Sequence, residues 1–431
     1  MRFKTVLMGL GAIMLVQIVV QGCSTFALAS SAAEKKVAPL DPNAPLMSPE
    51  DFDAAASVAT NWFHDDNPWH FASGTVGPDT PPVWVRPGWR IDKIGNTGGP
   101  RFMITDPDEN IYISAPFTGV IYKTKLVNGK LAPLTVFLEK KGAHAMQWVD
   151  GWLWFGTSGE IFKARDTKGT GKADEIVTVM GQGSLPTGGG HWMRALLVTK
   201  TGFYTEIGDA SNVGPVDDQR GRVWHYDLDG KNPEFYCAGL RNTEKLLFRP
   251  GTKEIWGWDH GSDWFGGPVG DKAGMQPTTD LNPPEEFNRL VKGGYYGHPF
   301  VVGYRVPRYE FMHRKDIVQL SAATIPPAAA LPAHYAPDGW TFYSGPGPMN
   351  GDCLVCAHGS WNRKEKAGYG VYWLPFDKVT GRPTGPMPLA FFLDKNGEVL
   401  GRPVDVMNMK DGSLLVTDDT KGNIYWLRPT K

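Results

Sequence analysis

Alternating hydrophobic and polar residues recur along the chain from about residue 86 to the C-terminus. One unit returns six times: an alternating apolar run, a polar turn with Asp or Gly, and a second alternating run. Two such runs joined at a Gly/Asp turn are typical of a β-hairpin. The six copies, of which the fifth is the least regular, lie at 102–114, 146–156, 196–206, 246–257, 339–356 and 404–417.

The spacing of the copies predicts the architecture. They mostly lie about 45 to 60 residues apart, which is the size of a four-stranded propeller blade. The longer, proline-containing stretch 261–335 is expected to hold the end of the fourth blade and an inserted loop. We therefore predict an all-β fold, a six-bladed β-propeller over 86–431. A two-sheet sandwich is the alternative, but it gives no reason for the same hairpin to repeat six times.

The N-terminus has the pattern of an export signal. Arg2 and Lys4 precede the apolar run 6–20, and a small-x-small site ends at Ala29. This pattern predicts a signal peptide over 1–29 and a periplasmic or secreted product.

A lipoprotein signal with Cys23 as the acceptor is the alternative, and it would make a lipid anchor the only contact with the membrane. Residues 30–85 are rich in Ala, Pro, Asp and Ser without a clear period, so we expect a tether and a surface-wrapping extension.

Composition supports the strand prediction and excludes other classes. The chain has 52 Gly, 35 Pro and 16 Trp, a mixture that suits short strands, tight turns and aromatic packing between sheets. The net charge of −1 gives no electrostatic reason for binding nucleic acid or an anionic membrane. No Gly-x-Gly-x-x-Gly follows a predicted strand in the mature chain, which argues against a nicotinamide dinucleotide domain.

Three cysteines remain after the signal: Cys237, Cys353 and Cys356. The last two lie on a predicted strand, where residues three apart point to opposite faces, so a disulfide between them would be strained. A haem attachment motif needs a histidine directly after the second cysteine, and Ala357 stands there. We predict that these are ordinary core cysteines.

Several polar segments stand at the ends of the predicted hairpins. Three glycines at 188–190 precede His191, and Asp209 follows the third hairpin. Glycines let the backbone approach a ligand, and a histidine there could act as a general base. A hydrogen-bonded loop histidine is the alternative.

Arginines recur at comparable positions of several blades. Arg241 and Asn242 precede the fourth hairpin, Arg402 precedes the sixth, and Arg363 follows the fifth. The guanidinium fork matches carboxylates, so these residues suit an acidic ligand. Structural or surface arginines are the alternative.

The segment around Gly261 and Ser262, with 283–299, is rich in oxygen ligands and glycine turns, as Ca²⁺ sites are. A polar surface loop is the alternative. The segment 166–175 has the outline of a calcium loop, but Lys168 and Thr170 stand where ligands belong, so we do not expect a metal there.

In this order, Gly-Gly-His191, Ile-Gly-Asp209, Gly-Leu-Arg241-Asn242, Asp-His-Gly261 and Gly-Gly-Tyr-Tyr-Gly-His-Pro299 resemble the soluble pyrroloquinoline quinone (PQQ) dependent sugar dehydrogenases. The resemblance covers about 102–427. The segment His-Gly-Ser-Trp-Asn-Arg363 is most similar to the sorbosone dehydrogenase-like branch.

The resemblance implies a cofactor and the residues that bind it. It implies PQQ in an axial cleft, contacted by Arg241, Asn242, Arg363 and Arg402. It also implies an active-site Ca²⁺ held by the backbone carbonyls of Gly261 and Ser262.

Two positions depart from the family pattern. Val404 replaces the second arginine of a pair on the last blade, and Asn362 stands near the place of a lysine. Both departures weaken the expectation of PQQ binding.

The implied reaction is the oxidation of an aldose or a sorbosone-like sugar. His191 would remove the hydroxyl proton, and electrons would leave to a respiratory acceptor. Two alternatives stay open: a calcium-dependent lactonase on the same fold, and a non-catalytic propeller that binds a sugar-like ligand.

Overall fold

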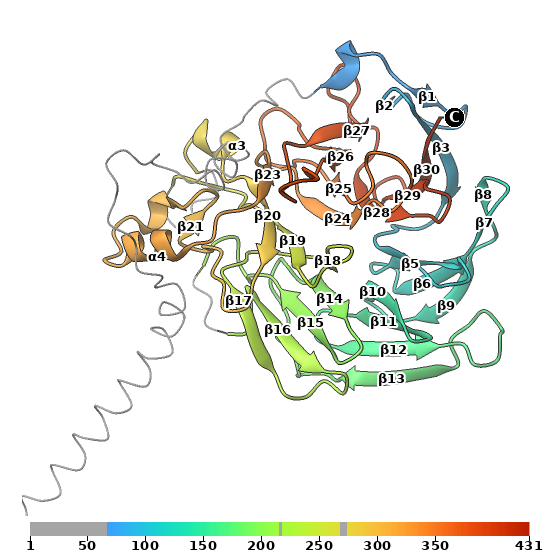
Figure 1. Cartoon of the computed structure of the whole chain (residues 1–431), viewed down its shortest axis with the longest axis horizontal. Coiled ribbons are helices and arrows are strands. Elements are labelled where there is room, and N and C mark those ends of the chain that lie inside the picture. Colours follow the sequence, from blue (N-terminus) through green and yellow to red (C-terminus); the bar gives the residue numbers. More distant parts are fainter. Residues whose placement is uncertain (1–66, 215–217, 268–273, 431) are drawn as a thin grey trace, which may run out of the picture.

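Six β-sheets stand around one central axis in the computed structural model (Figure 1). The structure describes residues 67–214, 218–267 and 274–430. The predicted signal peptide, Cys23 and most of the extension 30–85 lie outside the described residues. Within these residues, no helix is both long and apolar enough to span a membrane.

The first three blades follow the chain directly, each strand pairing antiparallel with the next. Blade 1 consists of β4 (Met103–Thr105), β5 (Ile111–Ala115), β6 (Val120–Thr124) and β9 (Thr135–Glu139), with the small hairpin β7 (Leu126–Val127) and β8 (Lys130–Leu131). Blade 2 consists of β10 (His144–Val149), β11 (Trp152–Gly156), β12 (Ile161–Arg165) and β13 (Glu175–Met180). Blade 3 consists of β14 (Arg194–Val198), β15 (Gly202–Ile207), β16 (Arg222–Asp227) and β17 (Glu234–Ala238).

The last three blades include chain segments from outside the simple repeat. Blade 4 consists of β18 (Leu246–Phe248), β19 (Ile255–Asp259), β20 (Glu285–Leu290) and β23 (Ala329–Leu331). Blade 5 consists of β24 (Pro337–Phe342), β25 (Cys353–Ala357), β26 (Gly370–Leu374), β27 (Met387–Phe391) and β2 (Trp84–Val85). Blade 6 consists of β28 (Pro403–Asn408), β29 (Leu414–Asp418), β30 (Asn423–Pro429), β3 (Trp89–Asn96) and β1 (Thr75–Val76).

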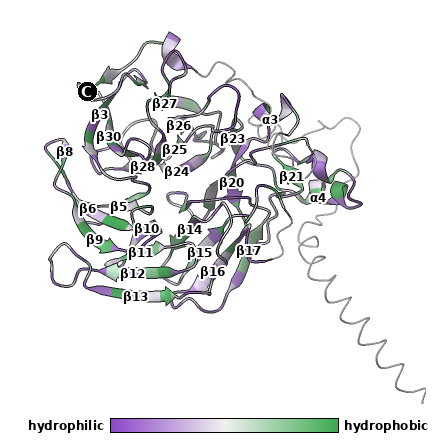
Figure 2. Ribbon diagram, turned by 180° about the vertical axis from the view of Figure 1, so that it is seen from behind, coloured by the Kyte–Doolittle hydropathy of each residue, from purple (hydrophilic) through white to green (hydrophobic). Residues whose placement is uncertain are grey.

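The prediction of a six-bladed propeller is confirmed. Each of the six predicted hairpins is the first pair of strands of one blade: β4–β5, β10–β11, β14–β15, β18–β19, β24–β25 and β28–β29. Hydrophobic residues concentrate on the strands (Figure 2). This placement follows from the alternating pattern, because one face of each blade packs on its neighbour.

Blade 6 closes the ring by joining the two ends of the described chain. β3 pairs antiparallel with β30, so that Ile91 lies opposite Leu427. β1 adds parallel to β3, and β2 adds to β27 of blade 5. Both β1 and β2 precede residue 86, so the chain before the first hairpin extends two propeller sheets.

The long stretch after β19 forms an insertion at the periphery, as its length predicts (Figure 1). It contains α3 (Thr278–Leu281), β21 (Val301–Val302), β22 (Val306–Pro307), η3 (Tyr309–Phe311) and α4 (Ile317–Ala323). A short helix near the start of the described chain, η2 (Pro68–His70), packs beside blade 5 through a bond from the Trp69 indole N–H to the Leu393 carbonyl.

The largest hydrophobic cluster lies among blades 4, 5 and 6. Phe287 stacks on Trp258 with ring centroids 4.7 Å apart and meets Trp340 edge-on at 5.3 Å. Cys353 and Cys356 belong to the same cluster, and they and Cys237 are buried and free. The prediction that the three are core cysteines is confirmed.

Ring closure gives the first prediction. Ile91 on β3 is fully buried, whereas Ile176 on β13 is 52% exposed. We expect Ile91→Ala to lower the free energy of unfolding by about 2–5 kcal/mol, because it leaves a cavity where β3 pairs with the last strand, β30. Ile176→Ala should change it by roughly 0.5 kcal/mol or less. Urea unfolding of both variants measures the difference, and equal losses would contradict the role of this pairing.

Candidate functional site

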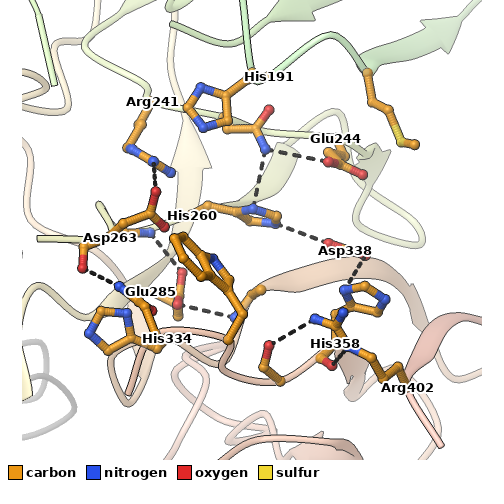
Figure 3. A pocket seen from close by; sticks show the side chains of 18 of the residues that line it. His191, Arg241, Glu244, His260, Asp263, Glu285, His334, Asp338, His358 and Arg402 are labelled. Carbon is orange, nitrogen blue, oxygen red and sulfur yellow. Dashed lines mark hydrogen bonds and ion pairs between the residues drawn. The ribbon is translucent and has the colours of Figure 1, made fainter. Parts of the chain in front are cut away.

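A cavity of about 400 Å³ opens at the axis, at the end where the loops entering the inner strands meet (Figure 3). Its walls come from five of the six inner strand entries and from the loops after β19 and β25. The side chains of His191 and Arg241 lie on one side, and those of His358 and Arg402 lie on the opposite side.

Most of the predicted site residues lie together in this cavity. Its lining includes His191, Arg241, Asn242, Gly261 and Arg402. Their convergence follows from the radial arrangement, which brings equivalent loops of distant blades to one axis.

Two predicted residues are not part of the lining. Ser262 is buried behind the wall, where its hydroxyl donates to the Trp264 carbonyl at 3.0 Å and accepts from Arg308 at 2.7 Å. Arg363 does not line the cavity, whereas its neighbour Asn362 does.

His191 is held in one orientation by a backbone carbonyl. Its Nδ1 lies 2.6 Å from the carbonyl oxygen of Asp209. A carbonyl can only accept, so Nδ1 carries the proton and the lone pair of Nε2 is left for a ligand. Burial and, as the second cause, the nearby Arg241 cation lower the pKa of His191 to about 3.

Glycine is required beneath this histidine. A Cβ atom on Gly208 would lie 2.7 Å from the Cβ of His191 and 2.7 Å from the Arg241 carbonyl oxygen. In the Gly208–Asp209 pair that the sequence singled out, Gly208 therefore leaves room for His191, and the Asp209 carbonyl accepts a hydrogen bond from its ring.

The loop that carries Arg241 and Asn242 is fixed by one carboxylate at the end of β19. Asp259 accepts the backbone N–H groups of both residues at 2.8 Å and the Thr243 hydroxyl at 2.9 Å. This arrangement fixes the backbone from which the Arg241 side chain reaches the cavity.

Arg241 donates to the carbonyl and side-chain oxygens of Asn212, both at 2.8 Å, and its nearest carboxylate is Asp263 at 3.8 Å. Arg402 donates to the carbonyl oxygens of His358 and Gly359, at 3.1 and 3.2 Å. Neutral carbonyls orient a guanidinium but leave its charge for an anion.

Arg101 has the opposite environment. It is buried and forms ion pairs with Glu244, Asp338 and Asp419 at 3.1, 2.9 and 3.0 Å. Burial lowers the pKa of Arg101, but the three carboxylates outweigh that effect and raise it above its ordinary value. His358 donates to the same Asp419 at 2.9 Å, so the floor of the cavity is a network of paired charges.

The loop at Gly261 is shaped by a buried carboxylate. Glu285 accepts the Gly261 N–H at 2.7 Å and the Ala336 N–H at 3.1 Å, and burial raises the pKa of Glu285. A Cβ on Gly261 would lie 2.8 Å from the Pro283 carbonyl oxygen. Among the described residues, no hydrogen bond ends on the carbonyl oxygen of Gly261 or Ser262.

The two departures from the family pattern lie in different places. Val404 is fully buried in β28 and does not line the cavity. The Asn362 side chain donates to the Asp263 carbonyl, and its Oδ1 is buried without a donor among the described residues.

Sequence reasoning missed several cavity residues, among them Arg101, Glu244 and Asp338. A signal was available for Arg101, because it directly precedes the first hairpin as Arg402 precedes the sixth. Glu244 and Asp338 carry no such signal, since acidic residues near strand ends are common.

Comparison with known proteins places the chain in a family. The model of the TrAA12-like family matches residues 83–430. The chain belongs to the TrAA12-like family. An uncharacterized protein of Borreliella burgdorferi is 26% identical over 343 residues, which is 76% of this chain and 85% of that protein.

Solved structures share the fold of this TrAA12-like propeller. One is the PQQ domain of a pyranose dehydrogenase from Coprinopsis cinerea, with a TM-score of 0.69 and 19% identity over 82% of this chain and 100% of that one. Another is a family AA12 carbohydrate-active enzyme from Trichoderma reesei, with a TM-score of 0.70 and 18% identity over 83% of this chain and 100% of that one. A PQQ-bound aldose sugar dehydrogenase from Streptomyces coelicolor matches with a TM-score of 0.52 at 15% identity, over 79% of this chain and 98% of that one. The resemblance predicted from the sequence is confirmed at the level of fold and family.

The second prediction concerns the protonation of His191. Because its pKa is lowered to about 3, we expect a neutral ring with the proton on Nδ1 at about pH 5, where an ordinary histidine is charged. Nitrogen-15 NMR of histidine-labelled protein, assigned with His191→Gln, measures the state of each ring nitrogen. Arg241→Gln should raise the pKa of His191, and an imidazolium at pH 6 in the unsubstituted protein would contradict the geometry.

Proposed function

We propose that this protein is a quinoprotein dehydrogenase that oxidises an aldose or a sorbosone-like sugar, with PQQ and Ca²⁺ in the axial cavity. The observation that carries the proposal is the set of three groups facing one cavity: the unprotonated Nε2 of His191 and the guanidinium groups of Arg241 and Arg402. The solved relatives described as a PQQ domain and as a PQQ-bound aldose dehydrogenase support the cofactor.

The residues present fit a planar cofactor with three carboxylates. Burying such an anion needs fixed cations and donors around it. Arg241 and Arg402 stand on opposite sides of the cavity and are held by carbonyl oxygens. Arg402 can bind a carboxylate directly, and Arg241 has to give up only the long contact with Asp263 at 3.8 Å. Asn242 lines the same cavity.

The charge of the lining supports a divalent cation. Four carboxylates line the cavity, those of Glu244, Asp263, Glu285 and Asp338, against three guanidinium groups. An anionic cofactor would add negative charge to a site that already has more acids than arginines, so a Ca²⁺ ion would balance it. The carbonyls of Gly261 and Ser262, which accept no hydrogen bond from the residues that the structure describes, are suitable hard oxygen ligands.

In the proposed reaction, the protein's own residues handle the proton of the anomeric hydroxyl group. When bound, PQQ supplies the two-electron acceptor that takes the hydride from the anomeric carbon. His191 accepts the anomeric hydroxyl proton at Nε2, while the Asp209 carbonyl holds the ring through Nδ1. The sugar leaves as the lactone, and the low pKa of His191 favours release of the proton from its ring.

The cellular setting follows from the predicted signal peptide. In a periplasmic or secreted protein, electrons would pass to a respiratory acceptor rather than to soluble nicotinamide.

A calcium-dependent lactonase is less well supported. The ligand atoms of Glu244, His260 and Asp338 do lie within 4.8 Å of one another. However, Arg101 already binds Glu244 and Asp338, and a metal would have to displace that buried cation. A propeller that only binds a sugar-like ligand would not need the low-pKa base at His191.

Substitutions at His191 and Arg241 give the third prediction. With PQQ and Ca²⁺ added, His191→Ala should lower dye-linked aldose oxidation by roughly 10²-fold or more while PQQ binding persists, because only the base is lost. Arg241→Ala should weaken PQQ binding, because a charge-assisted pair is lost. His70→Ala, at an exposed position of η2, is the control and should change neither aldose oxidation nor PQQ binding. Full activity of His191→Ala would disprove the catalytic assignment.

Metal removal gives the fourth prediction. Chelation with EDTA should weaken PQQ binding and abolish dye reduction, because the acidic lining then opposes the anionic cofactor. Added CaCl₂ should restore both, as measured by PQQ titration and dye reduction. Unchanged PQQ affinity in EDTA would show that Ca²⁺ does not balance this site.

A further inference from the structure

An aromatic pair stands at the opening of the axial cavity, formed by the exposed Trp361 and the half-buried Trp264. Trp264 follows β19 and Trp361 follows β25, and their rings meet edge-on with centroids 5.8 Å apart. Trp361 lines the cavity yet is 65% exposed. A single exposed aromatic residue is common on protein surfaces, so the pair requires a further observation before it indicates a ligand.

Polar groups beside the pair provide that observation. Asp263 and Asn362 also line the cavity, and the Asn362 side chain binds the Asp263 carbonyl, which joins the two loops. The Asn362 Oδ1 atom is buried without a donor among the described residues. Within the described part of the chain, the Asp263 carboxylate has only the distant contact with Arg241 at 3.8 Å. An unpaired buried acceptor costs free energy that a donating ligand would recover.

We propose that these four residues, Asp263, Trp264, Trp361 and Asn362, form a subsite for a second sugar ring, so that the substrate is a reducing oligosaccharide. We call the four residues the rim patch. A pyranose ring has an apolar C–H face and hydroxyl groups around its edge. An aromatic face covers the first, and carboxylate and amide oxygens accept from the second. The inference rests on the proposed function.

The position of the rim patch determines which ring it would bind. The oxidised ring must reach His191 Nε2 inside the cavity, on the wall formed by the loop before β14. Trp361 stands at the opening with most of its surface in solvent, so a ring stacked on it extends outward. That ring is the neighbour of the oxidised one, joined to it by the glycosidic bond.

The departure at Asn362 agrees with this use. A lysine in its place would add a cation toward the cofactor, whereas the amide offers an acceptor to a neutral hydroxyl. The residue that leaves the family pattern is therefore one that lines the cavity next to Trp361 and has an acceptor without a donor among the described residues.

Binding of non-oxidisable glycosides tests the subsite. Methyl β-glucopyranoside, methyl β-cellobioside, methyl β-maltoside and methyl β-lactoside have no free anomeric hydroxyl, so they bind without turnover. With protein loaded with PQQ and Ca²⁺, quenching of tryptophan fluorescence measures each dissociation constant. We expect at least one disaccharide glycoside to bind about tenfold more tightly than the monosaccharide glycoside.

Variants separate the rim patch from general effects. Trp361→Ala should remove that tenfold preference, Trp361→Phe should retain part of it, and Asn362→Leu should reduce it. Tyr309→Ala, an aromatic residue 58% exposed on η3 in the peripheral insertion, should leave it unchanged.

The outcomes distinguish this inference from the proposed function. If the loaded protein oxidises aldoses but shows no disaccharide preference, or keeps it in Trp361→Ala, the subsite is wrong and the proposed function stands. A Trp361→Ala defect confined to the KM of a protein electron acceptor would also overturn the subsite in favour of a docking role. If neither PQQ nor any glycoside binds, the proposed function fails as well.

Discussion

One buried guanidinium group joins four blades at the propeller axis. Arg101, at the entry to blade 1, forms ion pairs with carboxylates from the entries to blades 4 and 5 and from the end of the second strand of blade 6. Withdrawing such charges from water is costly, and the cost is offset only when partners and hydrogen bonds are complete. Loss of one partner of such a network typically costs about 3–5 kcal/mol. The inner strands must therefore stay in register for the network to form.

The same network divides the cations of the cavity into two kinds. Arg101 is neutralised by its carboxylates and belongs to the floor. Arg241 and Arg402 are oriented by carbonyl oxygens and keep their charge. The difference lies in the partner rather than in the residue type, since a carbonyl fixes geometry without cancelling charge. An acidic ligand would therefore be drawn to the two walls and not to the floor.

The proposed base, His191, is held and kept neutral by its neighbours. Burial and the Arg241 cation keep the His191 ring neutral, and the Asp209 carbonyl selects the tautomer that presents Nε2. Glycine at 208 lets that ring lie against the strand end without a steric clash. At the opening, Trp361 presents aromatic surface beside Asp263 and Asn362, and the Trp264 ring packs edge-on against it. Charge is thus concentrated at depth, and surfaces suited to neutral hydroxylated ligands lie at the entrance.

The sequence by itself determined the fold and the main elements of the site. Period-two alternation sets which face of a strand is buried, and its sixfold recurrence sets the number of blades, because each blade buries its face only against another. Residues next to hairpin starts, such as His191, Arg241 and Arg402, were identifiable because all blades present the same loops to the axis. Only the tertiary structure decided which arginine is neutralised, since Arg101 meets Asp419 across 318 positions of sequence. The tertiary structure also decided that Ser262 lies behind the cavity wall, and that Asn362 rather than Arg363 lines the cavity. These outcomes depend on side-chain packing between loops of different blades, and no local pattern in the sequence encodes those distances.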